Sequence, residues 1–438
     1  MQRKVAGYFY LALLLISVIL LLAGGNAQAS GNDVTILKVE GNIVPVVADY
    51  INRGIQEAEE RGSVACIIML NTPGGLLDST EKIVQRIMNA NVPVVVYIAP
   101  HGAWAASAGT FITVSSHISA MAPATSIGAA HPVSVGEEMP EEQKKKVTEY
   151  SAAWIKSIAE KRGRDPALVD AAVRESKSFT ALQAAEYKLV DFVAEDIEAV
   201  VRGINGRQVI LANGRQVMID TIDVVLKYSE MTGIEEFLHM ISDPNVAYIL
   251  LSLASVGLIT EISNPGMIFP GVIGGICLFF AFYSLGVLNA YWAGLLLILL
   301  ALGLFVTEIF IPAYGILTAG GVVSLLIGSF ILFSNSDASM QIDPYIIVVT
   351  TAIVAGFVAF LVWAVVRGQT RKVTTGKEAM VGLPAIVKTE LKPKGMVLVD
   401  GEIWSAEIEG GTAQPGEEVI ISKVDNLKLY VKKKNTGG

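Results

Sequence analysis

Two short segments combine residue types that could carry out acyl-transfer chemistry. Residues 71–75 read Asn-Thr-Pro-Gly-Gly and follow an apolar run. No Cβ hinders the backbone N–H groups of Gly74 and Gly75, so they can approach a substrate carbonyl as an oxyanion hole requires. Residues 103–110 place Ser107 among small residues, where we expect a helix to begin. Small neighbours leave room for a peptide, and a helix N-terminus favours developing negative charge.

Taken alone, each segment also has an ordinary explanation, as a glycine turn or as a serine N-cap.

The strands and helices that would position these segments are easier to predict from the sequence. Residues 64–70 form a fully apolar run, 78–89 are amphipathic at helical spacing, and 93–98 are again strand-like. This alternation between residues 33 and 201 predicts a parallel sheet covered by helices. Both segments then lie at carboxyl ends of strands, the edge where such sheets place their sites.

Together with residues 121–130, Met-Ala-Pro-Ala-Thr-Ser-Ile-Gly-Ala-Ala, the two segments resemble the Clp/crotonase superfamily. The sequence most closely resembles the membrane-bound NfeD-type Clp-class serine proteases, the stomatin operon partner proteins, over essentially its whole length. The resemblance implies an α/β Clp/crotonase-like protease domain with Ser107 as the nucleophile. It also implies that the amides of Gly75 (or Gly74) and Ala108 are the oxyanion donors.

A serine nucleophile needs a base. His101, His117 and His131 lie in the same domain, but none occupies a position that the family uses. The resemblance implies a Ser-Lys dyad and points to Lys146, although composition alone favours a solvated lysine run at 144–146. A lysine is neutral, and so able to act as a base, only if desolvation or positive neighbours lower its pKa. We expect the segment 134–146 to be a mobile loop, so that substrate or assembly positions the base.

Several other classes of function find little support. The net charge is −8, with no large basic cluster in the soluble part, which argues against nucleic-acid binding. The four histidines show no paired spacing, so we expect neither a metal nor another cofactor. Cys66 and Cys277 lie in apolar settings and are interpreted as small core residues rather than as a disulfide.

The N-terminus has the pattern of a secretory signal. Arg3 and Lys4 precede an apolar stretch at 8–23, and Ala27-Gln28-Ala29 supplies a cleavage site. A retained signal anchor is the alternative, because the apolar run is long. In both cases the protein from Ser30 onward starts outside the cytoplasm.

The middle of the chain predicts a membrane block. Apolar segments lie at about 247–262, 271–288, 291–311, 316–333 and 345–366, and the first is short enough to be a half-span. Arg367, Arg371, Lys372 and Lys377 follow the last segment, so the positive-inside rule places that end in the cytoplasm. An extracytoplasmic first domain then requires an odd number of spans, which five satisfies.

A short motif recurs inside this block. Thr-Glu-Ile at 260–262 and again at 307–309 precedes a proline and a glycine-rich helix start. An ion or proton path is one interpretation of Glu261 and Glu308. Because no lysine or arginine lies within the block, we favour the alternative, in which each glutamate caps a turn near a helix end.

The C-terminal tail alternates apolar and polar residues in five short runs separated by glycine turns. This spacing predicts a small all-β barrel of the OB type, and protein contact is its expected role because it has no aromatic stacking pairs. The predicted domains are a signal at 1–29, a protease domain at 30–240, a transmembrane block of four to five helices at 241–366, and a linker with the barrel at 367–438.

The sequence therefore predicts a multi-pass cell-membrane serine endopeptidase that acts on hydrophobic segments of membrane proteins. The resemblance implies a stomatin/prohibitin-family partner and a homo-oligomer. Two alternatives stay open. One is a catalytically inert membrane scaffold, which the intact Ser107 and Gly74-Gly75 disfavour. The other is a crotonase-type acyl-CoA enzyme, disfavoured because CoA is cytoplasmic and this domain follows a signal.

Overall fold

The computed structural model describes residues 31–132, 140–263, 266–288, 290–311, 313–334, 341–369 and 380–434. The predicted signal at 1–29 and the basic residues Arg371, Lys372 and Lys377 lie outside this range. The chain divides into two units, residues 1–359 and 360–438.

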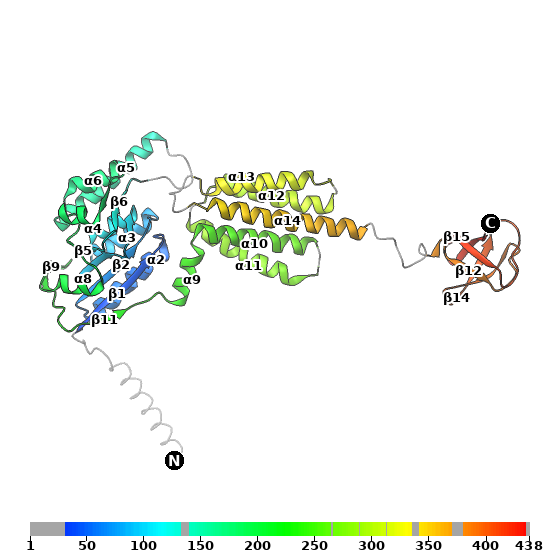
Figure 1. The fold of residues 1–438 in the computed structure, drawn as a ribbon, viewed down its shortest axis with the longest axis horizontal. Helices are drawn as coiled ribbons and strands as arrows, with labels where there is room; N and C mark the ends of the chain where they lie inside the picture. The colour runs from blue at the N-terminus through cyan, green and yellow to red at the C-terminus, as the bar shows by residue number, and fades with distance from the viewer. Residues whose placement is uncertain are drawn as a thin grey trace, which may run out of the picture. The chain divides into compact units, whose positions relative to one another are not determined.

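A parallel six-stranded sheet forms the centre of the α/β domain that precedes the membrane block (Figure 1). Its order is β11 (Val225–Tyr228), β1 (Asp33–Glu40), β2 (Ala65–Asn71), β3 (Val94–Ile98), β5 (Ile118–Met121) and β8 (Phe192–Val193). β2 and β3 are apolar along most of their length because both faces of the sheet are covered, which confirms the parallel sheet predicted from the sequence.

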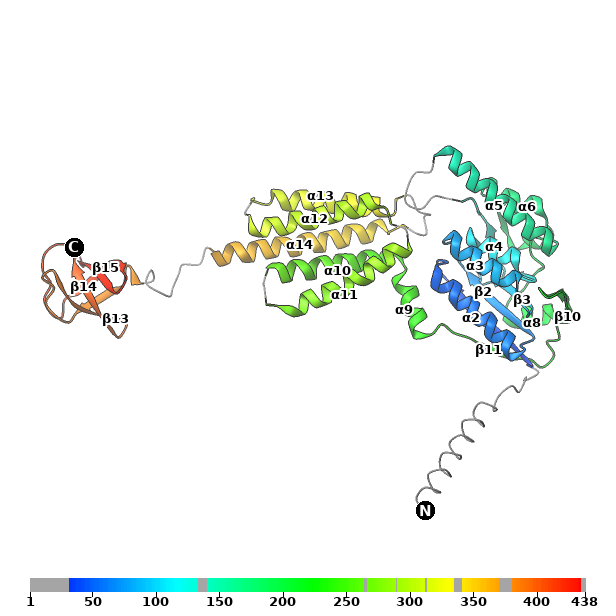
Figure 2. The same cartoon turned by 180° about the vertical axis from the view of Figure 1, so that it is seen from behind.

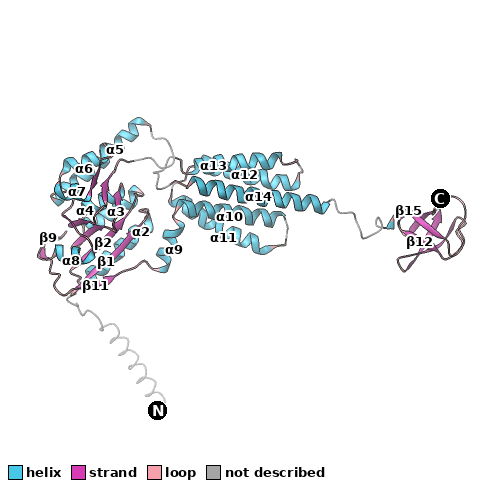
Figure 3. Ribbon diagram, viewed as in Figure 1, coloured by secondary structure: helices cyan, strands magenta, loops and turns pink. Residues whose placement is uncertain are grey.

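Helices cover this sheet on both faces (Figure 3). One face carries α2 (Pro45–Arg61), α3 (Leu77–Met88) and α4 (Ala108–Ser115), and Gly54 of α2 lies so close to Leu37 that a Cβ there would be 2.3 Å from its Cδ2. The opposite face packs Ile36 and Ile67 against Val200 of α8 (Ile197–Ile204).

A smaller sheet stands beside the main one and carries the candidate nucleophile at its edge. It consists of β4 (Trp104–Ala106), β6 (Ser126–Gly128) and β7 (Ser178–Thr180). The remaining elements before the membrane block are α5 (Glu141–Arg162), α6 (Pro166–Arg174), α7 (Ala181–Glu186), the hairpin β9 (Gln208–Ile210) and β10 (Gln216–Met218), and α9 (Gly233–Ile241). Residues 141–146, expected to belong to a loop, instead begin α5.

Five helices form the predicted membrane block (Figure 2). They are α10 (Pro244–Ser263), α11 (Ile268–Val287), α12 (Trp292–Phe310), α13 (Ile316–Leu332) and α14 (Pro344–Gln369). All except α13 are long and apolar enough to cross a membrane by length and composition, whereas α13 has 17 residues. The first segment, short enough in the sequence to be a half-span, belongs to a helix of 20 residues, α10, which by length and composition is long enough for a full span.

The recurring glutamate motif ends the first helix of each of two helical hairpins, α10–α11 and α12–α13. Glu308 is buried, and its carboxylate accepts the N–H groups of Gly315 and Thr318 at 2.9 Å each, at the start of α13. The capping role is confirmed for Glu308. At the matching position, Oε2 of Glu261 is buried with no hydrogen-bond partner in the described part of the chain.

The second unit contains a closed five-stranded barrel of the OB-like kind predicted. It is built from β12 (Pro384–Val387), β13 (Lys394–Val399), β14 (Glu402–Ile408), β15 (Glu418–Asp425) and β16 (Lys428–Lys433). A parallel pairing of β14 with β16, Ser405 opposite Lys428, contributes to its closure. Its interior holds alternate apolar residues such as Val397, Ala406 and Leu429, all fully buried.

Candidate active site

Ser107 occupies a strained turn between β4 and α4. Its φ of 48° and ψ of −112° fall in a region that residues other than glycine rarely adopt. A sharp strand-to-helix turn of this kind lifts a nucleophilic serine out of a sheet in other hydrolases. The serine does not cap α4 with its side chain, contrary to the ordinary explanation of its position.

Hydrogen bonds from β6 hold this turn in place. The N–H of Ser107 donates to the carbonyl of Gly128 at 3.1 Å. The Thr110 hydroxyl oxygen is 3.0 Å from the carbonyl oxygens of both Ala105 and Gly128 and accepts the Gly128 N–H at 3.1 Å. Thr110 is fully buried. Since strain of about 1–3 kcal/mol persists only where surrounding contacts enforce it, Thr110 is a positioning residue for Ser107.

The glycine loop after β2 lies beside this turn. Thr72 bridges β2 to β4, because its N–H donates to the Trp104 carbonyl at 2.8 Å and its carbonyl accepts the Ala106 N–H at 3.1 Å. Gly75 packs so tightly on Ile43 that a Cβ would lie 2.3 Å from the Ile43 carbonyl oxygen. Only glycine fits at this position without a backbone shift.

Of the two glycine amides in this loop, one is engaged in a hydrogen bond within the loop and the other is left to bind an oxyanion. The N–H of Gly74 donates to the Thr72 hydroxyl at 3.1 Å, so it is already engaged. Within the described residues, neither the Gly75 N–H nor the Ala108 N–H donates a hydrogen bond. Of the donors considered from the sequence, Gly75 and Ala108 are therefore the pair that fits, and Gly74 is the weaker candidate.

Two cavities border Ser107. The first, about 820 Å³, is also lined by Trp104 and Ala106 of β4 and by His239 and Met240 of α9. The second, about 470 Å³, is lined by Gly75 and Ala108 and, on α3 and α5, by Lys82 and Ser151. An extended polypeptide could run from one cavity to the other with its scissile carbonyl at Ser107.

Lys146 is not brought together with Ser107. It lies exposed in α5, whereas its neighbour Val147 lines the second cavity. Tyr150, one turn further along α5, donates a hydrogen bond to Glu81 of α3 at 3.0 Å. The stacked rings of Phe111 and Trp154, 4.8 Å between centroids, attach the middle of α5 to α4. The structure thus places the start of α5 at the border of the cleft without completing a dyad.

The histidines considered from the sequence have other contacts. His101 is 3.7 Å from Glu195, and His131 Nδ1 lies 2.8 Å from the carbonyl oxygen of Val173. His117 Nδ1 accepts the Val94 N–H at 3.1 Å, and burial lowers the pKa of His117 to about 3. No cluster of metal-ligating side chains occurs among the described residues.

Sequence reasoning missed four residues at this site. Thr72 and Thr110 belong to the two segments at 71–75 and 103–110. Their hydroxyl groups were the only feature of the sequence that could have indicated these hydrogen bonds. Lys82 and His239 line the cavities beside Ser107, but Lys82 lies in an ordinary amphipathic helix and His239 is 132 positions away from Ser107 in the sequence. Their proximity depends on the tertiary fold.

A parallel α/β sheet, a strained serine turn and two free backbone donors beside it define a serine hydrolase of the Clp-like class. Three family models match consecutive parts of the chain. They describe an NfeD1b N-terminal domain at residues 33–206, an NfeD integral membrane domain at 245–364, and an NfeD-like C-terminal, partner-binding domain at 377–433. The chain belongs to the NfeD family and is a membrane-bound serine protease.

Two known proteins resemble the chain over nearly its whole length, and a solved domain resembles about half of it. The "Membrane-bound protease PH1510" of Pyrococcus horikoshii is 35% identical over 440 residues, covering 97% of this chain and 99% of that protein. The "Membrane protein NfeD1b" of Bacillus subtilis is 26% identical over 98% of each chain. A solved N-terminal domain of a membrane-bound stomatin-specific protease, a lysine-to-alanine mutant with a substrate peptide, is 35% identical. It covers 48% of this chain and 98% of its own, with a TM-score of 0.46.

The support of the serine turn by Thr110 can be tested with a matched pair. Thr110→Val removes the buried hydroxyl that bonds to Gly128 and Ala105 around the serine turn, which should cost about 1–3 kcal/mol of stability. It should also lower kcat for peptide hydrolysis well below the wild-type value at a temperature where the protein stays folded. Thr113→Val is the control, because the equally buried Thr113 hydroxyl donates only to Gly109 within α4. Equal kcat values for the two variants would contradict a positioning role.

Proposed function

We propose that this protein is a membrane-anchored endopeptidase with a Ser107–Lys146 dyad that cleaves hydrophobic segments of membrane proteins. The observation that carries the proposal is the strained Ser107 turn, which borders two cavities and has the unengaged N–H groups of Gly75 and Ala108 beside it.

In this mechanism the Ser107 hydroxyl oxygen attacks the scissile carbonyl while its proton passes to the neutral amine of Lys146. The N–H groups of Gly75 and Ala108 stabilise the oxyanion of the tetrahedral intermediate. Removing such a donor costs roughly 10²–10³ in kcat in a studied serine protease. The protonated lysine then donates to the leaving amine, and water hydrolyses the acyl-enzyme through the same base.

Lys146 must approach Ser107 for this chemistry. The second cavity is lined by Val147 and Ser151 of α5, so a movement of the first turns of α5 would bring the Lys146 amine into the cleft. Substrate binding or assembly of a homo-oligomer would supply this movement and remove water from the amine. Desolvation is what lowers the pKa of a lysine enough for it to act as a base.

A stomatin-like membrane protein is the proposed substrate or partner. The barrel matches a model described as a partner-binding domain, and a relative's solved domain is described as a stomatin-specific protease. An inert scaffold role is less well supported, because a scaffold has no need of a strained serine beside free amide donors. An acyl-CoA enzyme is disfavoured by the proposed location of this domain outside the cytoplasm.

For sidedness, we propose an extracytoplasmic protease domain and a cytoplasmic barrel. Five crossings require α13 to span, and its 17 residues reach roughly 26 Å at ~1.5 Å per residue, close to the ~30 Å hydrocarbon core. A topology reporter fused after Val201 should be active outside the cytoplasm, and one fused to the C-terminus should be active inside. Reporters active on the same side would show an even number of crossings, with α13 re-entrant.

The identity of the base is tested by comparing lysine variants in one peptidase assay. Ser107→Ala sets the inactive reference. Lys146→Ala should lose nearly as much rate as Ser107→Ala, because the members of a catalytic unit are not additive. Lys146→Arg should fail too, since a guanidinium stays protonated. Lys144→Ala and Lys145→Ala should cost much less.

Lys82→Ala is the structural control in this series, because Lys82 already lines the cavity at Ser107. The proposal expects it to retain most activity. An inactive Lys82→Ala beside an active Lys146→Ala would transfer the role of base to α3 and overturn the assignment of Lys146.

A further inference from the structure

The first cavity at Ser107 receives one wall from outside the protease fold. His239 and Met240 of α9 and Val246 of α10 line the same cavity as Ser107. These residues lie beyond the end of the matched N-terminal family model at residue 206. The segment that connects the protease domain to the membrane block therefore contributes directly to the candidate substrate cleft.

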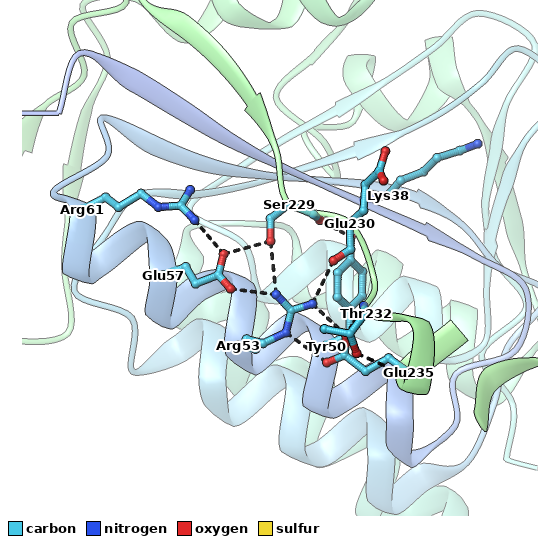
Figure 4. A network of polar contacts seen from close by, with 9 residues as sticks. All are labelled: Lys38, Tyr50, Arg53, Glu57, Arg61, Ser229, Glu230, Thr232 and Glu235. Atoms are coloured by element: carbon cyan, nitrogen blue, oxygen red, sulfur yellow. Dashed lines mark hydrogen bonds and ion pairs between the residues drawn. The ribbon is translucent and has the colours of Figure 1, made fainter. Parts of the chain in front are cut away.

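An arginine of α2 fixes the beginning of α9 (Figure 4). The Arg53 guanidinium binds Glu235 in a bidentate manner, with N–O distances of 3.0 and 2.7 Å. The Glu235 side chain is 15% exposed, and its hydrogen bond with Arg53 lowers the pKa of the carboxyl. Glu235 also closes a capping box with Thr232 at the N-terminus of α9.

The chain leading into α9 is held at the same point. Arg53 donates to the Glu230 carbonyl at 2.9 Å, and the Tyr50 hydroxyl donates to the Ser229 carbonyl at 2.7 Å (Figure 4). The Ser229 hydroxyl donates to Glu57, which also binds Arg53. Residues 229–235 are thereby attached to α2 through several partly buried polar contacts.

The other end of α9 rests against the loop after β1 and against the membrane block. A Cβ built on Gly41 would lie 3.7 Å from the His239 ring, so this ring packs against the loop after β1. Phe237 meets Phe280 of α11 edge-on, with 5.1 Å between ring centroids. Contacts at both ends therefore keep α9 at the edge of the cavity.

The side chains that α9 and α10 bring to the cavity meet apolar residues of the protease fold. Val44 and Trp104 line the same space as Met240 and Val246. Trp104 and Met240 are large apolar side chains that remain 52% and 54% exposed. Exposed apolar surface gathered at one cleft marks a site for an apolar ligand group.

We propose that α9 and the first turn of α10 form a substrate-selecting wall. In this arrangement Met240 and Val246, with Val44 and Trp104, accept a bulky apolar side chain of an extended polypeptide beside the scissile bond. The Arg53–Glu235 ion pair is the positioning contact that holds the wall. This inference rests on the proposed endopeptidase function and adds the specificity-determining residues to it.

The test uses the full chain in detergent and pairs of fluorogenic peptides. The peptides differ only by leucine or alanine at one position, scanned on both sides of the cleaved bond. At the position that contacts the wall, wild type should prefer leucine, since apolar contacts in a pocket are worth about 10–200-fold in kcat/KM. Met240→Ala should reduce this leucine-to-alanine ratio about tenfold.

Ile234→Ala is the matched control. Ile234 also lies on α9, is 74% exposed, and does not line the cavity. Its variant should keep the wild-type ratio. Identical ratios for Met240→Ala and wild type at every scanned position would overturn the substrate-selecting wall.

The positioning contact is tested by Glu235→Gln against Glu236→Gln. Glu235→Gln removes the charge that binds Arg53, so the wall should loosen, with KM for the leucine peptide raised and kcat nearly unchanged. Glu236 is exposed on the same turn, so Glu236→Gln should leave both constants at wild-type values. A purely structural loss would lower the active fraction, and hence kcat, without changing KM, and would contradict this role.

The two proposals fail in different ways. If the wild-type chain shows no hydrolysis that Ser107→Ala abolishes, the endopeptidase function falls and the selecting wall falls with it. If hydrolysis depends on Ser107 but the peptide preference is independent of Met240, only the wall is wrong.

Discussion

The backbone of Ser107 adopts a conformation that the rest of the protease domain must enforce. Its φ of 48° carries a cost of roughly 1–3 kcal/mol, which a helix N-cap in the ordinary extended conformation would avoid. The buried Thr110 hydroxyl and the Gly128 carbonyl hold the turn to β6, and Thr72 holds β4 to the end of β2. These contacts bring the Gly75 and Ala108 amides to the border of one cavity, beside the serine. The parallel sheet is necessary because it brings the ends of β2 and β3 to one edge.

Residues outside the α/β domain also line the candidate cleft. α9 is attached to α2 through Arg53 and meets α11 through Phe237 and Phe280, so the same short helix contacts the protease fold and the membrane block. The Phe237–Phe280 contact joins the helix that lines the first cavity to the membrane block.

Much of the fold could be predicted from the sequence. The apolar runs at 64–70 and 93–98 predicted the buried parallel strands, and the alternation in the tail predicted the barrel, because both patterns follow local burial. The motif containing Gly75 and Ser107 indicated the family, although its residues alone fitted ordinary turns. The hydrogen bond from the Gly74 amide to Thr72 within the glycine loop escaped prediction, and so did the tertiary placement of Lys82 and His239 beside Ser107. The exposed position of Lys146 is the one that composition alone favours. The length of the first membrane helix was not predicted, because apolar content does not reveal where a helix starts. α10 begins at Pro244, ahead of its apolar run.

Covalent labelling followed by peptide mapping shows whether Ser107 is the activated nucleophile. The full-length protein in detergent is treated with a fluorophosphonate, which a serine oxygen attacks at phosphorus with loss of fluoride, and the digested protein is examined by tandem mass spectrometry. We expect a single phosphonylated site, at Ser107, formed faster as pH rises because a neutral amine must accept the serine proton. Phosphonylation of another serine at a comparable rate, or none at Ser107 in a preparation that hydrolyses peptides, would contradict this role of Ser107.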